Sequence, residues 1–349
     1  MFRGLPDDLF NTTIRDIDYI DARSREDLTF FKTGFGKIDK WCGGGFRPAT
    51  QILLAARPNF GKSSILQSLL KNLIKLNENV IVLAISLDDT KSTFLSRWIA
   101  GDTECAISTV EDRATRNQDQ EERVQESYRK FKIDYARKMM VLDAADIQGK
   151  LDNIEAQMKH VFAKVCSVND KKPQLVVTID SPRNLNFSHV SGLSANPAAS
   201  TEYVGRRIKE MLAMEVEGVP VEPIILCTDH LKKLPPGIKR PGPDDIKDSI
   251  GPQYDANLIL MLWNDLCYCK TVTRTDSDMK FRRDDLLDPR TGECPYDPVV
   301  EISLAKNKMG RMDYANGGGI ALFKFYQEQS RMVPITSRDE YMSYANLIR

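Results

Sequence analysis

A short run of the sequence has the residues of a loop that binds phosphate groups. Gly61, Lys62 and Ser63 stand between an apolar stretch of strand length and an amphipathic stretch of helix length. In this arrangement backbone N–H groups at the helix N-terminus point at phosphate oxygens, the lysine reaches the β- and γ-phosphates, and the serine hydroxyl ligates Mg²⁺. The spacing predicts a site for ATP and Mg²⁺ formed by Arg57, Pro58, Asn59, Phe60, Gly61, Lys62, Ser63 and Ser64.

Asp180 is the candidate for the second metal ligand. It ends the apolar run Leu175–Asp180, where P-loop ATPases carry the carboxylate of the Mg²⁺ shell. A strand-end aspartate can instead cap a turn. Ala56 stands where the general phosphate-loop motif has its first glycine, and the tripeptide at 61–63 alone could occur by chance at a helix start. The strand before it and the helix after it favour the nucleotide site.

From Thr33 onward, apolar runs of strand length alternate with helical patterns. Runs rich in Val, Ile and Leu suit central parallel strands, and apolar residues at every third or fourth position suit helices that pack on a sheet. The alternation predicts an α/β fold with a mostly parallel sheet flanked by helices, and the late strands predict an antiparallel extension. The expected strands are Gln51–Ala56, Val80–Leu87, Met140–Ala144, Leu175–Asp180, Ile224–Thr228, Leu258–Trp263, Val299–Leu304 and Ile320–Tyr326, and the expected helices are residues 63–74, 151–165 and 203–214.

The composition limits the functions to consider. Among 349 residues, Lys+Arg and Asp+Glu both number 49, which argues against a protein that coats a polyanion but not against nucleic-acid binding by a few loops. The seven cysteines form no disulfide framework, and no window reaches the roughly 18 apolar residues of a membrane span. We expect a cytoplasmic protein without a membrane partner. Cys267, Cys269 and Cys294 could bind zinc but offer three sulfurs without a convincing fourth ligand.

Three polar stretches interrupt the pattern of strands and helices. They are Asn184–Ser200, Leu234–Gly251 and Thr273–Pro298. Loops of this length inside a compact domain usually carry function. Before the first strand, residues 1–30 contain isoleucines at near-helical spacing, which predicts a short helix followed by a linker.

Seven segments are collinear with the motifs of one known family. They are TGFGKIDKWCGGGF (33–46), AARPNFGKSS (55–64), VLAISLDDT (82–90), QLVVTIDSP (174–182), IILCTDHLKK (224–233), DDIKDSIGPQYDANLILMLWND (244–265) and EISLAKNKMG (301–310). Together they resemble the motor domain of the DnaB-type replicative DNA helicases of superfamily 4. That family often has alanine at the position of Ala56. The resemblance covers about residues 33 to 335 and implies a RecA-like P-loop ATPase fold.

The resemblance implies roles for residues at two strand ends. Asp88 stands where the family has the glutamate that positions the attacking water; its alternative role is to cap a helix starting near Asp89, which is itself the competing base. His230 would sense the γ-phosphate, as in the phage primase-helicase version, although a lone histidine is often only a packed residue. Asp229 stands at the position of the bacterial glutamine and is the alternative sensor.

The resemblance also implies contacts from a neighbouring subunit. The family carries a lysine and an arginine on the late strand that reach the next subunit's ATP, and this chain has Lys306 and Lys308 there. Lysine lacks the planar fork of arginine, so a weaker finger is expected. Two solvated lysines on an edge strand are the alternative. Arg331 falls near the family's end-of-domain nucleotide contact.

Basic residues cluster in the second long loop, which corresponds to the family's DNA-contacting loop. In a ring such residues would converge on a central pore and follow a phosphate backbone, and an ordinary solvated loop is the alternative. The loop has no aromatic ladder, which favours backbone contacts over base stacking. The expected DNA-binding residues are Lys232, Lys233, Lys239, Arg240, Lys247, Asp248 and Ser249.

The resemblance implies an ATP-dependent helicase that forms a homo-hexamer and moves on single-stranded DNA, with a primase or loader as a further partner. We expect residues 1–32 to form a linker helix and tail, 33–336 the motor domain and 337–349 a second tail, without the family's primase-binding N-terminal domain. Three alternatives stay open: a RecA- or KaiC-like ATP-dependent switch, an assembly protein with weak hydrolysis, and an unrelated P-loop kinase.

Overall fold

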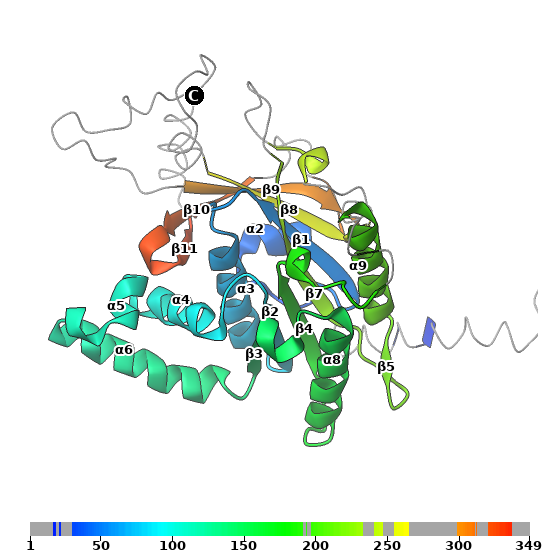
Figure 1. The fold of residues 1–349 in the computed structure, drawn as a ribbon, viewed down its shortest axis with the longest axis horizontal. Helices are drawn as coiled ribbons and strands as arrows, with labels where there is room; N and C mark the ends of the chain where they lie inside the picture. Colours follow the sequence, from blue (N-terminus) through cyan, green and yellow to red (C-terminus); the bar gives the residue numbers. More distant parts are fainter. Residues whose placement is uncertain are drawn as a thin grey trace, which may run out of the picture.

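The computed structural model describes residues 30–190, 193, 197–232, 241–246, 255–264, 299–310, 312 and 320–336, together with Ile17, Asp18 and Asp21. Within these residues the largest sheet has nine strands in the order β11-β10-β9-β8-β1-β7-β4-β2-β3 (Figure 1). They are β1 (Thr50–Ala56), β2 (Val80–Ser86), β3 (Met139–Asp143), β4 (Gln174–Asp180), β7 (Ile224–His230), β8 (Leu258–Trp263), β9 (Val299–Asn307), β10 (Ile320–Tyr326) and β11 (Arg331–Pro334).

The direction of the strands divides this sheet into two parts. From β8 to β3 all neighbours are parallel, whereas β9, β10 and β11 each run antiparallel to the strand before them. The predicted parallel sheet with an antiparallel extension is therefore confirmed. Because the six parallel strands share one carboxyl edge, the residues that follow β1, β2, β4 and β7 meet there.

Helices cover both faces of the sheet. Side chains alternate along β1, so that Ile52 and Leu54 enter the core beneath α3, whereas Leu53 and Ala55 enter a second core with α8 and α9. The helices are α2 (Gly36–Trp41), α3 (Lys62–Leu76), α4 (Lys91–Thr103), α5 (Ile107–Glu111), α6 (Gln118–Lys130), α7 (Ala144–Ile147), α8 (Leu151–Cys166) and α9 (Pro197–Leu212). No described helix has the length and apolarity needed to cross a membrane.

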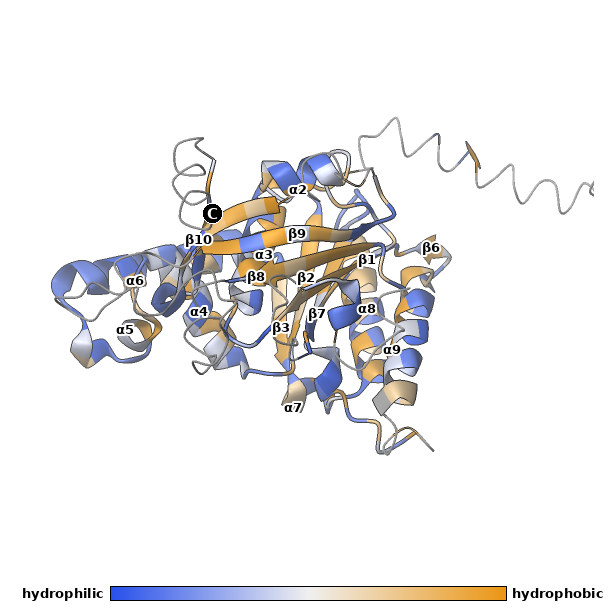
Figure 2. Cartoon of the chain, turned by 90° about the horizontal axis from the view of Figure 1, so that it is seen from above, coloured by the Kyte–Doolittle hydropathy of each residue, from blue (hydrophilic) through white to orange (hydrophobic). Residues whose placement is uncertain are grey.

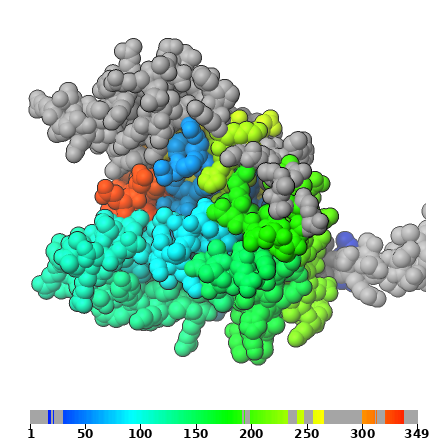
Figure 3. All heavy atoms as spheres, viewed as in Figure 1, coloured from blue at the N-terminus to red at the C-terminus, as the bar shows by residue number. Residues whose placement is uncertain are grey.

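The eight predicted strands and three predicted helices are all present, with ends shifted by a few residues. Within the segment 91–130, only a helix starting near Asp89 was considered; the helices α4, α5 and α6 form a lateral arm, seen in cyan and blue-green in Figures 1 and 3. Most of α6 is hydrophilic (Figure 2), and it buries only Val124 and Ser127. The short hairpin β5 (Glu215–Val216) and β6 (Val219–Pro220) and the strand β11 were also missed.

Candidate ATP-binding site

The phosphate loop connects the end of β1 to the start of α3. Gly61 caps α3 with a φ of 87°, and a Cβ there would lie 2.1 Å from Cε of Met332 on β11. Asn59 also has a positive φ, of 67°. Phe60 is buried and packs edge-to-face on Trp263, with ring centroids 5.6 Å apart. The loop is thus held from behind by β8 and β11, which leaves the N-terminal end of α3 to face an anion.

Asp180 faces the first turn of α3 from the end of β4. Its Oδ2 accepts a hydrogen bond from the Ser63 hydroxyl at 2.9 Å, and its Oδ1 accepts one from the Thr228 hydroxyl at 2.5 Å. The turn after β4 is capped by Ser181, whose hydroxyl accepts from the Arg183 N–H, so Asp180 is not needed as a turn cap. One hydroxyl and one carboxylate suit Mg²⁺, which keeps several waters and takes its other ligands from phosphates.

Asp88 lies beside Asp180 across the β2–β4 pair. Its N–H donates to the Asp180 carbonyl at 3.1 Å, and one of its carboxylate oxygens accepts a hydrogen bond from the Asn184 amide. Burial and then the charge of Asp180 raise the pKa of Asp88, which Lys62 opposes. A base close to the metal ligand and the phosphate-binding lysine is placed to orient water.

The geometry gives less support to Asp88 as a helix cap and to Asp89 as the base. The N-cap of α4 is Thr90, whose side chain accepts from the Thr93 N–H, so Asp88 does not cap that helix. Asp89 forms an ion pair with Arg97 of α4. Its carboxylate is therefore already engaged away from Asp180.

Lys62 and His230 meet at the centre of the site. The Lys62 Nζ is 3.3 Å from Nδ1 and 3.4 Å from Nε2 of His230, and only 8% of Lys62 is exposed. Burial lowers the pKa of Lys62, against the effect of Asp180, Asp88 and Asp229. The three carboxylates favour the charged ammonium, which is the form that binds phosphate.

Asp229, the alternative sensor, is held by other groups. Its Oδ1 accepts from Nε of Arg183 at 2.5 Å and from the His230 N–H at 2.7 Å. Burial raises the pKa of Asp229, and Arg183 acts in the opposite direction. Because the imidazole of His230 is the group that contacts Lys62, the geometry favours His230 as the sensor.

The last two nucleotide-binding candidates lie on the β11 side of the loop. The Ser64 hydroxyl is 2.9 Å from the Ser330 hydroxyl, and both residues are buried, so this side chain is turned away from the phosphate-binding face. Arg331 donates to Glu104 at 2.7 Å and lies over the ring of Tyr326, 4.4 Å from its centroid. Its role as a nucleotide contact stays a prediction.

Lys306 and Lys308 lie at the opposite edge of the sheet from the phosphate loop. The Lys308 N–H donates to the Asn257 carbonyl at 2.7 Å, and the Asn257 N–H donates to Gln51 at the start of β1. Gln51 is separated from Ala56 by roughly 17 Å of extended strand. Burial, followed by the charge of Lys308, lowers the pKa of Lys306 to about 8. These side chains are remote from the ATP site of their own chain and could serve only that of another.

The candidate DNA loop is described only in part. Lys232 follows His230 closely; its N–H donates to the Asp245 carbonyl at 2.7 Å, and its Nζ donates to the Asp244 carbonyl at 2.9 Å. The other DNA-binding candidates, Lys233, Lys239, Arg240, Lys247, Asp248 and Ser249, lie outside the described residues, as do Cys267, Cys269 and Cys294. In the described ranges no three His, Cys, Asp or Glu side chains converge as a metal cage would require.

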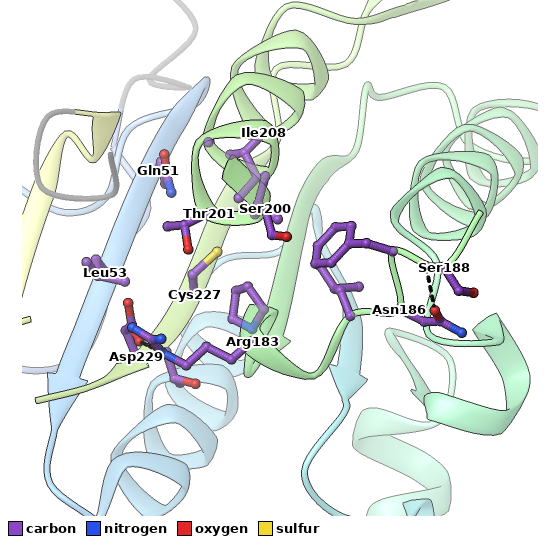
Figure 4. A pocket seen from close by; sticks show the side chains of 16 residues that line it. Gln51, Leu53, Arg183, Asn186, Ser188, Ser200, Thr201, Ile208, Cys227 and Asp229 are labelled. Carbon is purple, nitrogen blue, oxygen red and sulfur yellow. Dashed lines mark hydrogen bonds and ion pairs between the residues drawn. The ribbon is translucent and has the colours of Figure 1, made fainter. Parts of the chain in front are cut away.

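Three polar residues of the site were missed by the sequence analysis. Thr228 shares a strand face with His230, and alternation along β7 was a usable signal for it. Arg183 and Asn184 follow β4 directly, and only the run of polar residues there could have pointed to them. Figure 4 shows Arg183 beside Asp229 at one end of a cavity of about 390 Å³, which lies between β1, β7 and α9 on the face opposite α3.

Comparison with known proteins finds relatives among the replicative DNA helicases. The replicative DNA helicase DnaB of Helicobacter pylori is 23% identical over 321 residues, which are 90% of this chain and 58% of that protein. The DnaB of Geobacillus stearothermophilus is 23% identical over 335 residues, 95% of this chain and 62% of that protein. The chain thus spans less than two thirds of the length of these relatives.

Solved structures share the fold. A separately solved ATPase domain and a DnaB-like replicative helicase, described with its interactions with primase, both match at a TM-score of 0.68 and 18% identity. Each match covers 96% of this chain, and respectively 100% and 68% of the other. A family profile described as the DnaB-like helicase C terminal domain matches residues 31–318. The match covers most of the sequence, and the chain therefore belongs to the DnaB-like helicase C-terminal domain family.

Proposed function

We propose that this protein is an ATP-dependent DNA helicase or translocase of the replicative ring type, with residues 33–336 as its motor domain. The observation that carries the proposal is the cluster at the carboxyl edge of the sheet. There Lys62 and Ser63 of α3 face Asp180, and Asp88 and His230 lie beside them. This arrangement has a group for each task in ATP hydrolysis: phosphate binding, metal binding, water positioning and phosphate sensing.

Bound Mg²⁺ would supply charge neutralisation on the β- and γ-phosphates. Ser63 and Asp180 would hold it, since their side-chain oxygens lie 2.9 Å apart and can reach one point. Lys62 binds the phosphates, and Asp88 accepts a hydrogen bond from the attacking water and orients it in line with the γ-phosphate. His230 transmits the presence of the γ-phosphate to the segment after β7, because Lys232 is only two positions further along the chain.

The position of the late-strand lysines supports hydrolysis at interfaces between subunits. Lys306 and Lys308 lie too far from their own phosphate loop to contact its nucleotide, so they can act on ATP only where a second copy of the chain brings them to it. Head-to-tail contacts of this kind close into rings. We propose a homo-hexamer around single-stranded DNA, gripped by the loop from Lys232 to Ser249, with a primase or loader as a further partner.

The test is ATP hydrolysis by the purified protein with and without single-stranded DNA, beside a Lys62→Ala variant. The proposal expects turnover that DNA stimulates and that the variant loses. Strand displacement from a forked duplex then separates a helicase from a DNA-stimulated ATPase that does not unwind. Tight ATP binding with negligible turnover in both conditions would overturn the motor.

A second candidate is an ATP-binding switch or assembly protein with weak hydrolysis. Two substitutions favour it: Asp88 is one methylene shorter than the family's glutamate, and Lys308 offers a point charge where the family has the fork of arginine. Asp88→Glu and Lys308→Arg test it directly. If turnover rises strongly in both variants from a negligible level, the switch accounts for the wild-type protein better than the motor does.

A further inference from the structure

The turn Pro182–Asn184 lies at the centre of the carboxyl edge. It follows β4, which is flanked in the sheet by β7 on one side and β2 on the other. The turn is fixed to the end of β4, since Asn184 N–H donates to the Ser181 carbonyl at 3.1 Å and Pro182 restricts its own backbone. Two successive side chains of a rigid turn can therefore reach both neighbouring strands.

Each of the two side chains contacts a different carboxylate of the candidate ATP site. Arg183 reaches β7, where its Nε donates to Asp229 at 2.5 Å, and the same oxygen accepts the His230 N–H. Asn184 reaches the residues after β2, where its amide donates to Asp88 and lies 3.5 Å from the Leu87 carbonyl. The turn thus touches the group proposed to position water and the group next to the proposed sensor.

We propose that Arg183 and Asn184 are a pair of positioning residues for ATP hydrolysis. Arg183 fixes Asp229, and through the shared hydrogen bond the backbone of His230, so that the imidazole stays against Lys62. Asn184 orients the Asp88 carboxylate through the hydrogen bond from its amide. This inference rests on the proposed ATPase activity and adds to it two residues that the turn carries as a unit.

The charges around Asp88 explain why an amide suits this position. Asp180 at the end of β4, Lys62 of α3 and the neighbouring Asp89 all act on its carboxylate. A hydrogen bond from a neutral amide stabilises the charged carboxylate without adding a charge that would compete with Lys62 for the phosphates. An aspartate at 184 would add a like charge, and a leucine would remove the donor while keeping a similar size.

The first experiment measures kcat and KM for ATP in wild type, Asn184→Gln, Asn184→Leu and Asn184→Asp. A residue that orients the Asp88 carboxylate changes kcat and leaves KM nearly unchanged. We expect kcat to fall about tenfold in Asn184→Leu, further in Asn184→Asp and little in Asn184→Gln, with KM within about twofold. Asn186→Ala, two positions further on, is the matched control. Wild-type kcat in Asn184→Leu overturns the role of Asn184.

The second experiment replaces Arg183. We expect kcat to fall about tenfold or more in Arg183→Gln, with partial recovery in Arg183→Lys, because a buried carboxylate left without its donor takes up a proton. Arg206→Gln, whose guanidinium lies over the ring of Tyr203 on α9, removes the same charge nearby. Wild-type kcat in Arg183→Gln would remove Arg183 from the proposal.

A third measurement separates this inference from the ATPase proposal itself. Crystal structures of the nucleotide-free wild type and of Asn184→Leu compare the orientation of the Asp88 carboxylate whether or not the protein turns over. A changed orientation in Asn184→Leu supports the contact even if the wild type hydrolyses no ATP, which would overturn only the proposed function. An unchanged orientation together with active wild type overturns the inference alone.

Discussion

The two edges of the parallel sheet differ in how their lysines are surrounded by other charges. At the carboxyl edge, the charges of Asp180, Asp88 and Asp229 act on the Lys62 ammonium and oppose the lowering of its pKa by burial. At the amino edge, Lys306 and Lys308 lie next to each other, and their mutual repulsion contributes to lowering the pKa of Lys306. The proposed function assigns nucleotide binding to the first edge and a contribution to another copy of the chain to the second.

Loss of Lys62 tests the carboxyl edge of the sheet and has the largest expected effect. Lys62→Ala should lower ATP hydrolysis by about a hundredfold or more, because the developing charge on the phosphates loses its nearest cation. Steady-state hydrolysis measures it. Lys75→Ala, near the other end of α3 and beside the ring of Tyr135, is the control. Equal loss in both variants would indicate damage to the helix in place of damage to the site.

Mixing subunits of two variants tests the amino edge of the sheet. Lys62→Ala and Lys308→Ala should each be nearly inactive alone, whereas a random equal mixture should recover about a quarter of the wild-type rate, since a head-to-tail interface pairs one intact phosphate loop with one intact lysine. ATP hydrolysis after co-refolding or subunit exchange measures the recovery. No recovery would mean that Lys308 does not act across an interface.

The pH dependence of ATP hydrolysis at alkaline pH tests Lys306. Its pKa is lowered to about 8, so it is charged below that pH and neutral above it. If its charge assists hydrolysis, activity should fall as pH rises through about 8, and Lys306→Arg, which stays charged, should keep its activity to higher pH. The pH profile of kcat checks it. The same alkaline fall in Lys306→Arg would assign that limb to another group.

The smallest effect concerns Ser64, which belongs to the predicted phosphate loop but contacts Ser330, the residue before β11. Ser64→Ala should leave ATP affinity within about twofold, and loss of the bond to Ser330 should lower the free energy of unfolding by about 1 kcal/mol. Urea denaturation and nucleotide titration measure the two. A large loss of ATP affinity with an unchanged free energy of unfolding would indicate that Ser64 contacts the nucleotide.

The sequence was informative where a residue's role depends on a local pattern. The apolar runs placed β1, β2, β4 and β7 correctly, and parallel strands bring their carboxyl ends together whatever the loops between them. Lys62, Ser63 and Asp180 could therefore be predicted as one group from local patterns alone. The late strands, with fewer helical patterns between them, also indicated the antiparallel extension, although not β11, whose four residues carry too little pattern.

The rest depended on contacts between distant residues, which one sequence does not show. Whether Asp88 or Asp89 faces the metal site is decided by Arg97, which pairs with Asp89, and Asn184, which pairs with Asp88. The helix α6 was missed because its stability comes from capping by Asn117 and from charged pairs, since it buries very little apolar surface. Trp98, on α4, anchors the arm through Phe131 and Tyr135, at a separation that periodicity does not reveal.

The contact between Gly61 and Met332 has a consequence for the order of assembly. The phosphate loop is formed by residues near the start of the motor, but the surface behind it is supplied by Phe325 and Met332, on the last two strands of the sheet. During synthesis, domains fold as units as the chain emerges. The packing behind the loop is therefore complete only after β10 and β11 have been made, so the nascent chain carries the candidate phosphate-binding residues long before this side of the loop is covered.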